Sequence, residues 1–307
     1  MIDGSSPRLE RIRTRRVAER LLITPWVIEF NLRNLARMIA SFLRRVVPEG
    51  FRPIGYLTHL VRRRCAERVR LGPFAGMRYI DYSIGSAYLP KLLGTYEREL
   101  LPTIEQECAR RPGLIVDLGA AEGYYAVGLA LRNPEARVVA FESAEDGRAA
   151  LLKMAKLNGV RGQIEIRGHC APPDLQSVLE SRRDERTPVP NPRNADFLPV
   201  PDHPAFILCD VEGDERFLLD PFVVPSLQRA AILVETHEFI YPGITEALCE
   251  RFGSTHRVQL IWQTLRSRAD FPFHSLGTRL IPKSYLDWAV SEWRPIQMCW
   301  LWMQPYD

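Results

Sequence analysis

One stretch decides the fold of this chain: Gly113-Leu114-Ile115-Val116-Asp117-Leu118-Gly119-Ala120-Ala121-Glu122-Gly123-Tyr124-Tyr125. An apolar run ends in an acid, two glycines follow four positions apart, and the next residues favour a helix. This order predicts a buried strand, a tight turn and a helix N-terminus. Because glycine carries no side chain, such a turn lets a nucleotide-like ligand lie against bare backbone.

A second acid ends the next apolar run, Val138-Val139-Ala140-Phe141-Glu142. Glu142 lies 19 positions after Gly123, about where a second strand presents a carboxylate to ribose hydroxyls. The two oxygens of a carboxylate can accept from both hydroxyls. The alternative is an ordinary surface acid that follows a strand. The spacing and the preceding apolar run together favour the ribose-binding role.

These two segments resemble the class I S-adenosylmethionine-dependent methyltransferases. A third segment, Phe206-Ile207-Leu208-Cys209-Asp210-Val211-Glu212-Gly213-Asp214-Glu215, is similar to the Asp-Val-Glu-Gly-x-Glu signature of the FkbM-type methyltransferases. The resemblance also includes the Tyr124-Tyr125 pair, Gly94-Thr95-Tyr96-Glu97 and Ile232-Leu233-Val234-Glu235-Thr236-His237. It covers roughly residues 94 to 264. The chain departs from it at Ala121, where family members commonly have Asn, and this removes one polar contact to the cofactor.

The order of elements predicts an α/β fold. Apolar runs indicate strands near 113–118, 136–142, 163–167, 205–211 and 230–236, and helices fill 123–132, 145–158, 214–220 and 243–251. Strands that alternate with helices imply a mostly parallel sheet. The resemblance extends this to a Rossmann-like class I methyltransferase fold, a seven-stranded sheet flanked by helices, whose last strand (298–303) is antiparallel.

The predicted domain boundaries follow from composition. Residues 94–307 form the methyltransferase domain, with a Pro-rich exposed insertion at 183–204. Residues 1–93 form a basic, largely helical N-terminal extension that ends in a connector at 51–93. A helix is predicted over Tyr96–Arg110, with Thr95 as its cap. The resemblance instead places Tyr96 and Glu97 near the cofactor or the acceptor, and the helix start is the favoured interpretation.

The resemblance implies a set of cofactor contacts for S-adenosyl-L-methionine. The turn from Gly119 through Ala121 to Gly123 accommodates the aminoacyl part and the ribose. Asp117 lies near the methionine amine, and Glu142, with Ser143 beside it, binds the ribose. After the third strand, His169 or Cys170 contacts the edge of the adenine, and a plain turn there is an equal alternative.

The candidate reaction centre combines Asp210, Glu212 and His237, which follow the fourth and fifth strands. An acceptor hydroxyl must lose its proton as it attacks the sulfonium methyl group, and Glu212 or His237 could serve as the base. The alternatives are a helix-capping role for Glu212 and a structural role for His237. Together with Glu235 these residues could also bind Mg²⁺, but no metal is the favoured prediction.

Other function classes fit the sequence less well. A nicotinamide-dependent oxidoreductase would need Gly-x-Gly-x-x-Gly spacing, which the turn lacks, and Asp117 would repel a pyrophosphate. A methyltransferase-like domain that only binds or scaffolds remains the main alternative, because of Ala121 and the unusual N-terminal arm. The expected acceptor is a small molecule or a carbohydrate, and no zinc-finger spacing or RNA-binding aromatic motif indicates nucleic acid.

Composition predicts a globular protein of the cytoplasm. Apolar residues make up 46% and charged residues 25%, and no run of 18 uncharged apolar residues could span a bilayer. Six scattered cysteines form no Cys-x-x-Cys pair and no signal peptide precedes them, which indicates reduced thiols. They are Cys65, Cys108, Cys170, Cys209, Cys249 and Cys299.

The N-terminus is unusually basic. Residues 1–70 carry 16 arginines against 6 acids, while the whole chain has a net charge of only +4. Apolar residues from Ile28 to Val46 recur at steps of three and four, which predicts an amphipathic helix with Arg33, Arg37 and Arg44 on another face. Packing on its own domain or in a homo-oligomer is the favoured interpretation. Peripheral contact with the inner membrane surface is the alternative.

Overall fold

The computed structural model describes residues 53–184, 189–190, 197–198, 204–294 and 296–306. The chain divides into two compact units, Met1–Tyr56 and Leu57–Asp307. The predicted helix at 28–46, with its membrane or oligomer contacts, lies outside the described residues, as does most of the Pro-rich segment 183–204. Among the helices that are described, none has the length and apolar character needed to cross a bilayer.

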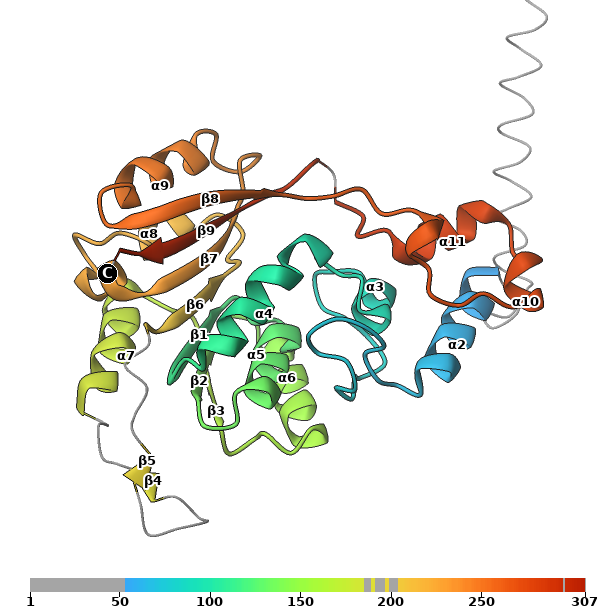
Figure 1. The fold of residues 1–307 in the computed structure, drawn as a ribbon, viewed down its shortest axis with the longest axis horizontal. Helices are drawn as coiled ribbons and strands as arrows, with labels where there is room; N and C mark the ends of the chain where they lie inside the picture. Colours follow the sequence, from blue (N-terminus) through green and yellow to red (C-terminus); the bar gives the residue numbers. More distant parts are fainter. Residues whose placement is uncertain (1–52, 185–188, 191–196, 199–203, 295, 307) are drawn as a thin grey trace, which may run out of the picture. The chain divides into compact units, whose positions relative to one another are not determined.

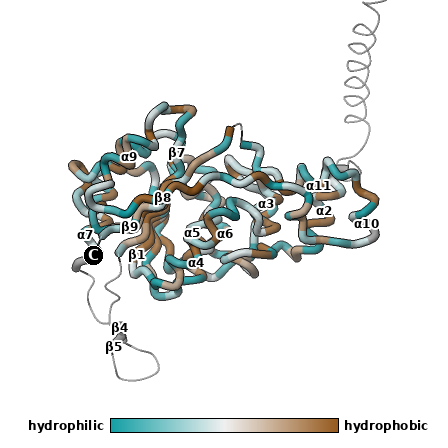
Figure 2. The backbone as a smooth tube through the Cα atoms, turned by 45° about the horizontal axis from the view of Figure 1, so that its top comes forward, coloured by the Kyte–Doolittle hydropathy of each residue, from teal (hydrophilic) through white to brown (hydrophobic). Residues whose placement is uncertain are grey.

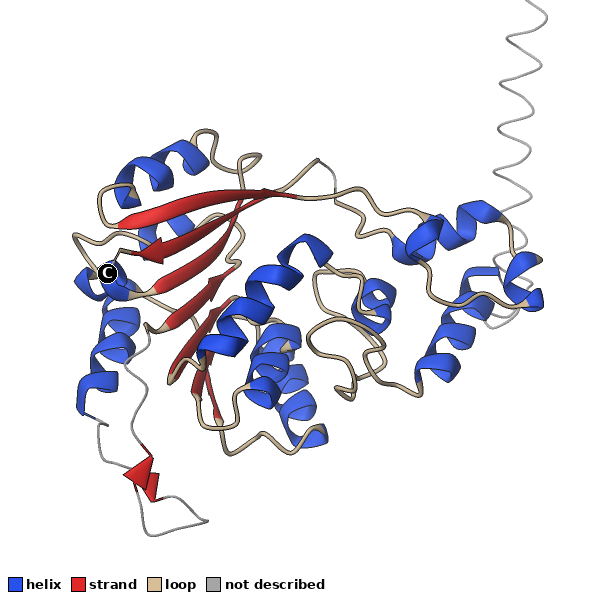
Figure 3. Ribbon diagram, in the orientation of Figure 1, coloured by secondary structure: helices blue, strands red, loops and turns tan. Residues whose placement is uncertain are grey.

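A seven-stranded sheet forms the centre of the second unit (Figure 3). Its strands, in spatial order, are β3 (Ile164–Arg167), β2 (Arg137–Phe141), β1 (Leu114–Leu118), β6 (Phe206–Cys209), β7 (Ala231–Thr236), β9 (Cys299–Pro305) and β8 (His256–Trp262). The first five are parallel, and β9 is antiparallel to both of its neighbours. This confirms the predicted Rossmann-like class I methyltransferase fold.

Helices cover both faces of the sheet (Figure 1). One face carries α4 (Leu101–Arg110), α5 (Tyr124–Arg132) and α6 (Glu145–Leu157), and the other carries α7 (Pro172–Asp184), α8 (Glu215–Leu218) and α9 (Ile244–Phe252). Successive strand residues point to opposite faces, so Ile115 packs with the first group and Val116 with the second. Figure 2 shows the central strands as a hydrophobic band between the two layers.

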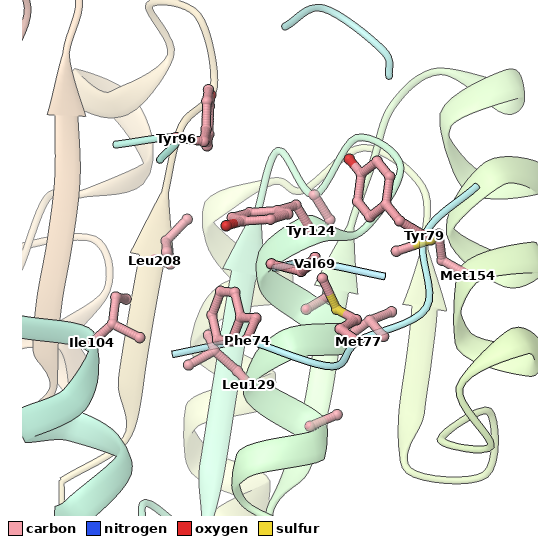
Figure 4. Packing of buried hydrophobic residues seen from close by; sticks show 14 of the residues in the cluster. Val69, Phe74, Met77, Tyr79, Tyr96, Ile104, Tyr124, Leu129, Met154 and Leu208 are labelled. Atoms are coloured by element: carbon pink, nitrogen blue, oxygen red, sulfur yellow. The ribbon is translucent and has the colours of Figure 1, made fainter. Parts of the chain in front are cut away.

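Residues 57–93, predicted to be a connector outside the domain, pack in the same compact unit as the sheet. They include most of α2 (Pro53–Cys65) and all of α3 (Tyr88–Leu93). Figure 4 shows Phe74 and Met77 beside Leu129 of α5, and the ring of Phe74 lies edge-on to Tyr124 with centroids 5.3 Å apart. These apolar side chains are buried in the main core, within the compact unit that begins at Leu57.

Three local predictions differ from the structure. The helix predicted from Tyr96 is a short 3₁₀ helix, η2 (Arg98–Leu100), followed by α4, because Glu97 has a φ of 45° and cannot belong to a helix. Thr95 therefore caps nothing. The helix predicted at 214–220 is the single turn α8.

Helix α7 and strand β8 were not predicted from the sequence. The remaining elements are β4 (Val189–Pro190), β5 (Phe197–Leu198), η3 (Pro225–Arg229), η4 (Arg268–Asp270), α10 (Leu276–Arg279) and α11 (Lys283–Val290).

Candidate functional site

A cavity of about 470 Å³ opens at the carboxyl ends of the parallel strands. In such a sheet this edge is where ligands bind, at the point where the strand order reverses, here between β1 and β6. Its lining includes Asp117, Gly119, Ala121, Glu142, Ser143, His169, Cys170, Asp210, Glu212 and His237. All of these were candidate site residues. Gly123 does not line the cavity and instead precedes α5 as its N-cap residue, with a φ of 90°.

Gly119 holds two strand ends close together. Its φ is 84°, and a Cβ atom built on it would lie 1.8 Å from the carbonyl oxygen of Asp210. Any side chain at this position would push β1 and β6 apart at the cavity. The glycine is therefore required by the close approach of Asp210 as well as by its backbone conformation.

Asp117 ends in the cavity wall with no partner. Its side chain is 1% exposed, and neither carboxylate oxygen accepts a hydrogen bond of ordinary geometry. Burial raises the pKa of this carboxyl to about 7, and the nearby Asp210 adds to the rise, while the backbone N–H of Ala126 opposes it. A buried carboxylate normally has a partner, so Asp117 is ready to receive a hydrogen-bond donor or a cation.

Glu142 is fixed by the backbone on both sides. The N–H of Ala121 donates to Oε2 and the N–H of Ala144 donates to Oε1, each at 2.7 Å. Ala121 has a φ of 46°, in the left-handed region that residues other than glycine rarely adopt. Each carboxylate oxygen has a second lone pair, so two further donors can still bind. Next along the cavity lie the exposed Ser143 and His169, while Cys170 is buried.

His237 stands at the centre of a group of carboxylates at the ends of β6 and β7. Its Nδ1 lies 2.5 Å from Oε1 of Glu215, and its Nε2 lies 3.5 Å from both Oδ1 of Asp210 and Oε2 of Glu212. Burial lowers the pKa of the imidazole, but the carboxylates of Glu215, Asp210 and Glu212 outweigh it and raise the pKa above its ordinary value. Asp210, Glu212 and His237 are thus brought together, as the strand ends predicted.

Two groups of ion pairs in the cavity wall, one around Lys91 and one around Arg294, were not predicted. Lys91 Nζ lies 2.5 Å from Oε1 of Glu122, and both side chains are buried. Arg294 pairs with Glu97 and Glu235. The four residues Lys91, Glu235, Arg294 and Tyr96 line the cavity, and Glu122 and Glu97 lie behind it. The Glu122 and Glu97 positions fall within the motifs that carried the family resemblance, but nothing in the sequence indicated their basic partners.

No family model and no curated protein matches the sequence of this chain. Among solved structures, the O-methyltransferase TomG from Streptomyces achromogenes, in complex with SAM, has 11% identity and a TM-score of 0.40, over 87% of this chain and 96% of that one. An O-methyltransferase from Bacillus cereus, with SAH, has 12% identity and a TM-score of 0.39, over 87% and 97%. Precorrin-6y C5,15-methyltransferase from Geobacter metallireducens has 10% identity and a TM-score of 0.39, over 67% and 89%. Scores this low decide nothing about the site, whose chemistry rests on its own geometry.

Proposed function

We propose that this protein is an S-adenosylmethionine-dependent methyltransferase of the FkbM type that methylates a hydroxyl group of a small molecule or carbohydrate. The observation that carries the proposal is the buried, unpartnered carboxylate of Asp117, in one cavity with the Gly119 turn and Glu142. Asp117 can pair with an ammonium group, the turn admits a ligand against its backbone, and Glu142 can accept from two hydroxyls.

This combination of groups fits the cofactor. S-adenosylmethionine supplies a methyl group activated by the positive charge on its sulfur, and it carries an amine and a ribose. The amine would lie at Asp117, where it would satisfy the free oxygens, and the ribose would lie at Glu142. The acidic cavity wall, with Asp117, Glu142 and Asp210, favours a ligand of positive charge.

The residues at the ends of β6 and β7, in the same cavity, support a role in activating the acceptor. Glu215 is fully buried and faces Nδ1 of His237, so that in the neutral imidazole Nδ1 donates and Nε2 keeps a free electron pair toward Asp210 and Glu212. As the acceptor oxygen attacks the methyl group, its proton can pass to Nε2 or to the carboxylate of Glu212. A cavity that holds both the cofactor and the acceptor would also increase the rate, because it orients the two reactants toward each other.

Two exposed aromatic side chains support the proposal that the acceptor is a carbohydrate or another molecule that stacks on aromatic rings. Trp293 is 61% exposed and Phe239 is 49% exposed, and both line the cavity. Exposed aromatic rings at a cavity are well suited to stack on the apolar face of a sugar ring. The backbone of Trp293 has a φ of 59°, a conformation that a bulky residue rarely adopts without a reason.

Isothermal titration of the full-length protein with S-adenosylmethionine and with S-adenosylhomocysteine tests the proposal. We expect micromolar binding, weakened at least tenfold by Glu142→Ala, because charge-assisted hydrogen bonds contribute about 1.5–3 kcal/mol. Glu145→Ala is the matched control: Glu145 is exposed, lies three positions further on and does not line the cavity. Absence of binding to folded wild-type protein, or equal loss in both variants, would refute the proposal.

A further inference from the structure

We propose that Asp210, Glu212 and His237 bind one divalent transition-metal ion, of the Mn²⁺ class, at the edge between β6 and β7. The ion's binding does not depend on the reaction, but its role in activating an acceptor rests on the proposed function. The three residues each offer one ligand atom, and these atoms all lie within 4.8 Å of one another.

The distances suit an ion after a small contraction. Nε2 of His237 is 3.5 Å from Oδ1 of Asp210 and 3.5 Å from Oε2 of Glu212. Around an octahedral ion with bonds of about 2.1 Å, neighbouring ligand atoms are about 3 Å apart and opposite ones about 4.2 Å apart. The Glu212 side chain is 73% exposed, so it can move by this amount without disturbing the core.

The histidine is already oriented as a ligand. Its Nδ1 faces Oε1 of Glu215 at 2.5 Å, and the N–H of Gly213 donates to the same oxygen at 3.1 Å. Glu215 is fully buried at the start of α8 and cannot turn away. The other ring N–H of a metal-binding histidine almost always donates a hydrogen bond to a carboxylate, a carbonyl or water, which fixes the ring and strengthens the ligand. The Glu215–His237 pair has this arrangement before any ion arrives.

The carboxylates at this edge also lack a cation. Oδ1 of Asp210 is buried without a hydrogen-bond partner. In the described part of the chain, Asp210 and Glu212 form ion pairs with His237 and with no lysine or arginine. Arg294, which also lines the cavity, is paired with Glu97 and Glu235. An ion at this point would balance charge that the described residues leave unbalanced.

The ligand set indicates which ion binds. Mg²⁺ and Ca²⁺ prefer oxygen ligands alone, whereas an imidazole with two carboxylates suits Mn²⁺, Fe²⁺, Co²⁺ or Zn²⁺. Three protein ligands leave positions open for water or for an acceptor hydroxyl. A hydroxyl bound there would become more acidic, and its proton could leave to water past the exposed Glu212. His237 would then hold the ion and would not itself act as the base.

The test is titration of Mn²⁺ and, separately, Mg²⁺ into full-length protein stripped with a chelator, read by calorimetry and by the loss of the free Mn²⁺ signal in electron paramagnetic resonance. We expect one Mn²⁺ per chain at micromolar affinity and Mg²⁺ at least tenfold weaker. Glu212→Gln removes a ligand charge on the surface and should weaken Mn²⁺ at least tenfold. Glu215→Gln, which touches no ion, should weaken it by 10–100-fold through the histidine. Glu246→Gln, an exposed acid of α9, is the control and should change nothing.

Several results would overturn the metal site: no Mn²⁺ binding to wild-type protein, Mg²⁺ binding as tight as Mn²⁺, or equal Mn²⁺ affinity in Glu212→Gln and Glu246→Gln.

A titration with S-adenosylmethionine on the same stripped protein separates the two proposals. Cofactor binding without Mn²⁺ binding refutes the metal site and leaves the proposed function standing. Mn²⁺ binding without cofactor binding supports the metal site and refutes the proposed function.

Discussion

Asp117, in β1, and Glu122, in the glycine turn that follows it, are both buried, at 1% and 0% exposure, yet their surroundings are opposite. Glu122 accepts from Tyr79, from Ser83 Oγ at 2.8 Å and from the N–H of Ile84 at 3.0 Å, and it pairs with Lys91. Burial alone would raise the pKa of Glu122, but Lys91 and these donors lower it to about 2. Neither oxygen of Asp117 accepts a hydrogen bond of ordinary geometry, and burial raises its pKa to about 7.

The difference separates a structural carboxylate from a binding one. Glu122 uses its lone pairs to hold residues 83–86, of which Ile84, Gly85 and Ser86 form part of the cavity wall. The hydrogen bonds and the ion pair of Glu122 therefore stabilise the folded protein itself and leave little capacity for a ligand. Asp117 is buried at a cost that Ala126 and Lys91 offset only in part, which is expected of a group whose partner is a ligand.

The largest expected effect is on Glu122. Glu122→Ala should destabilise the fold by about 3–5 kcal/mol, because it leaves the ammonium group of Lys91 buried without a partner. Chemical denaturation measures this. Glu105→Ala, which removes an exposed pair with Arg132, should cost less than about 1 kcal/mol. The double variant Glu122→Leu/Lys91→Met should recover most of the loss, and a double variant as unstable as Glu122→Ala would mean that the pair is not the cause.

Acid should remove part of the same stabilisation. The folded-state pKa of Glu122, about 2, is below its ordinary value of 4.5. Its contribution is therefore complete above pH 4.5 and is lost as the pH falls toward 2, by up to about 3 kcal/mol. Unfolding free energies measured from pH 5 to pH 2.5 should fall more steeply in the wild type than in Glu122→Leu/Lys91→Met. Parallel curves would contradict the assignment.

Substitution of Asp117 should affect cofactor binding and not folding stability, the opposite of the substitution of Glu122. Asp117→Asn removes an uncompensated buried charge, so we expect unchanged or higher folding stability. The same change should weaken S-adenosylmethionine binding by about 10–100-fold, because the ammonium group loses its charged partner. Thermal unfolding and calorimetric titration of one preparation measure both quantities. A variant that is unstable and binds normally would reverse the roles of the two carboxylates.

What the sequence could predict followed from local patterns. Apolar runs that end in acids located β1, β2, β6 and β7, and because parallel strands end at one edge, the neighbouring strand ends predicted that Asp210 and His237 would meet. Strand β8 was not predicted, because it lies at the edge of the sheet and several of its residues are exposed, which weakens its apolar pattern.

The ion pairs of the cavity wall could not be predicted, for a different reason. Lys91 and Glu122 are 31 positions apart, and Arg294 and Glu97 are 197 positions apart. Such pairs are formed by the packing of the whole unit, and no spacing rule connects their members. For the same reason Tyr96 and Glu97 were expected to start a helix, whereas Tyr96 lines the cavity and Glu97 holds Arg294.

The smallest expected effect is the pH dependence of cofactor binding. If the amine pairs with ionised Asp117, binding below pH 7 requires this carboxyl to lose a proton, since its pKa without a ligand is about 7. An α-amino group has an ordinary pKa near 8, so it is charged at pH 6 and about half charged at pH 8. The affinity should therefore fall about fivefold between pH 8 and pH 6, about 1 kcal/mol, with proton release on binding near pH 6. Calorimetry in two buffers of different ionisation enthalpy measures both the affinity and the release. Because other acids of the cavity also titrate, Asp117→Asn is the necessary comparison: its affinity should be nearly flat over the same range. If the variant keeps the wild-type slope, another group controls it, and Asp117 is buried for a reason other than the cofactor.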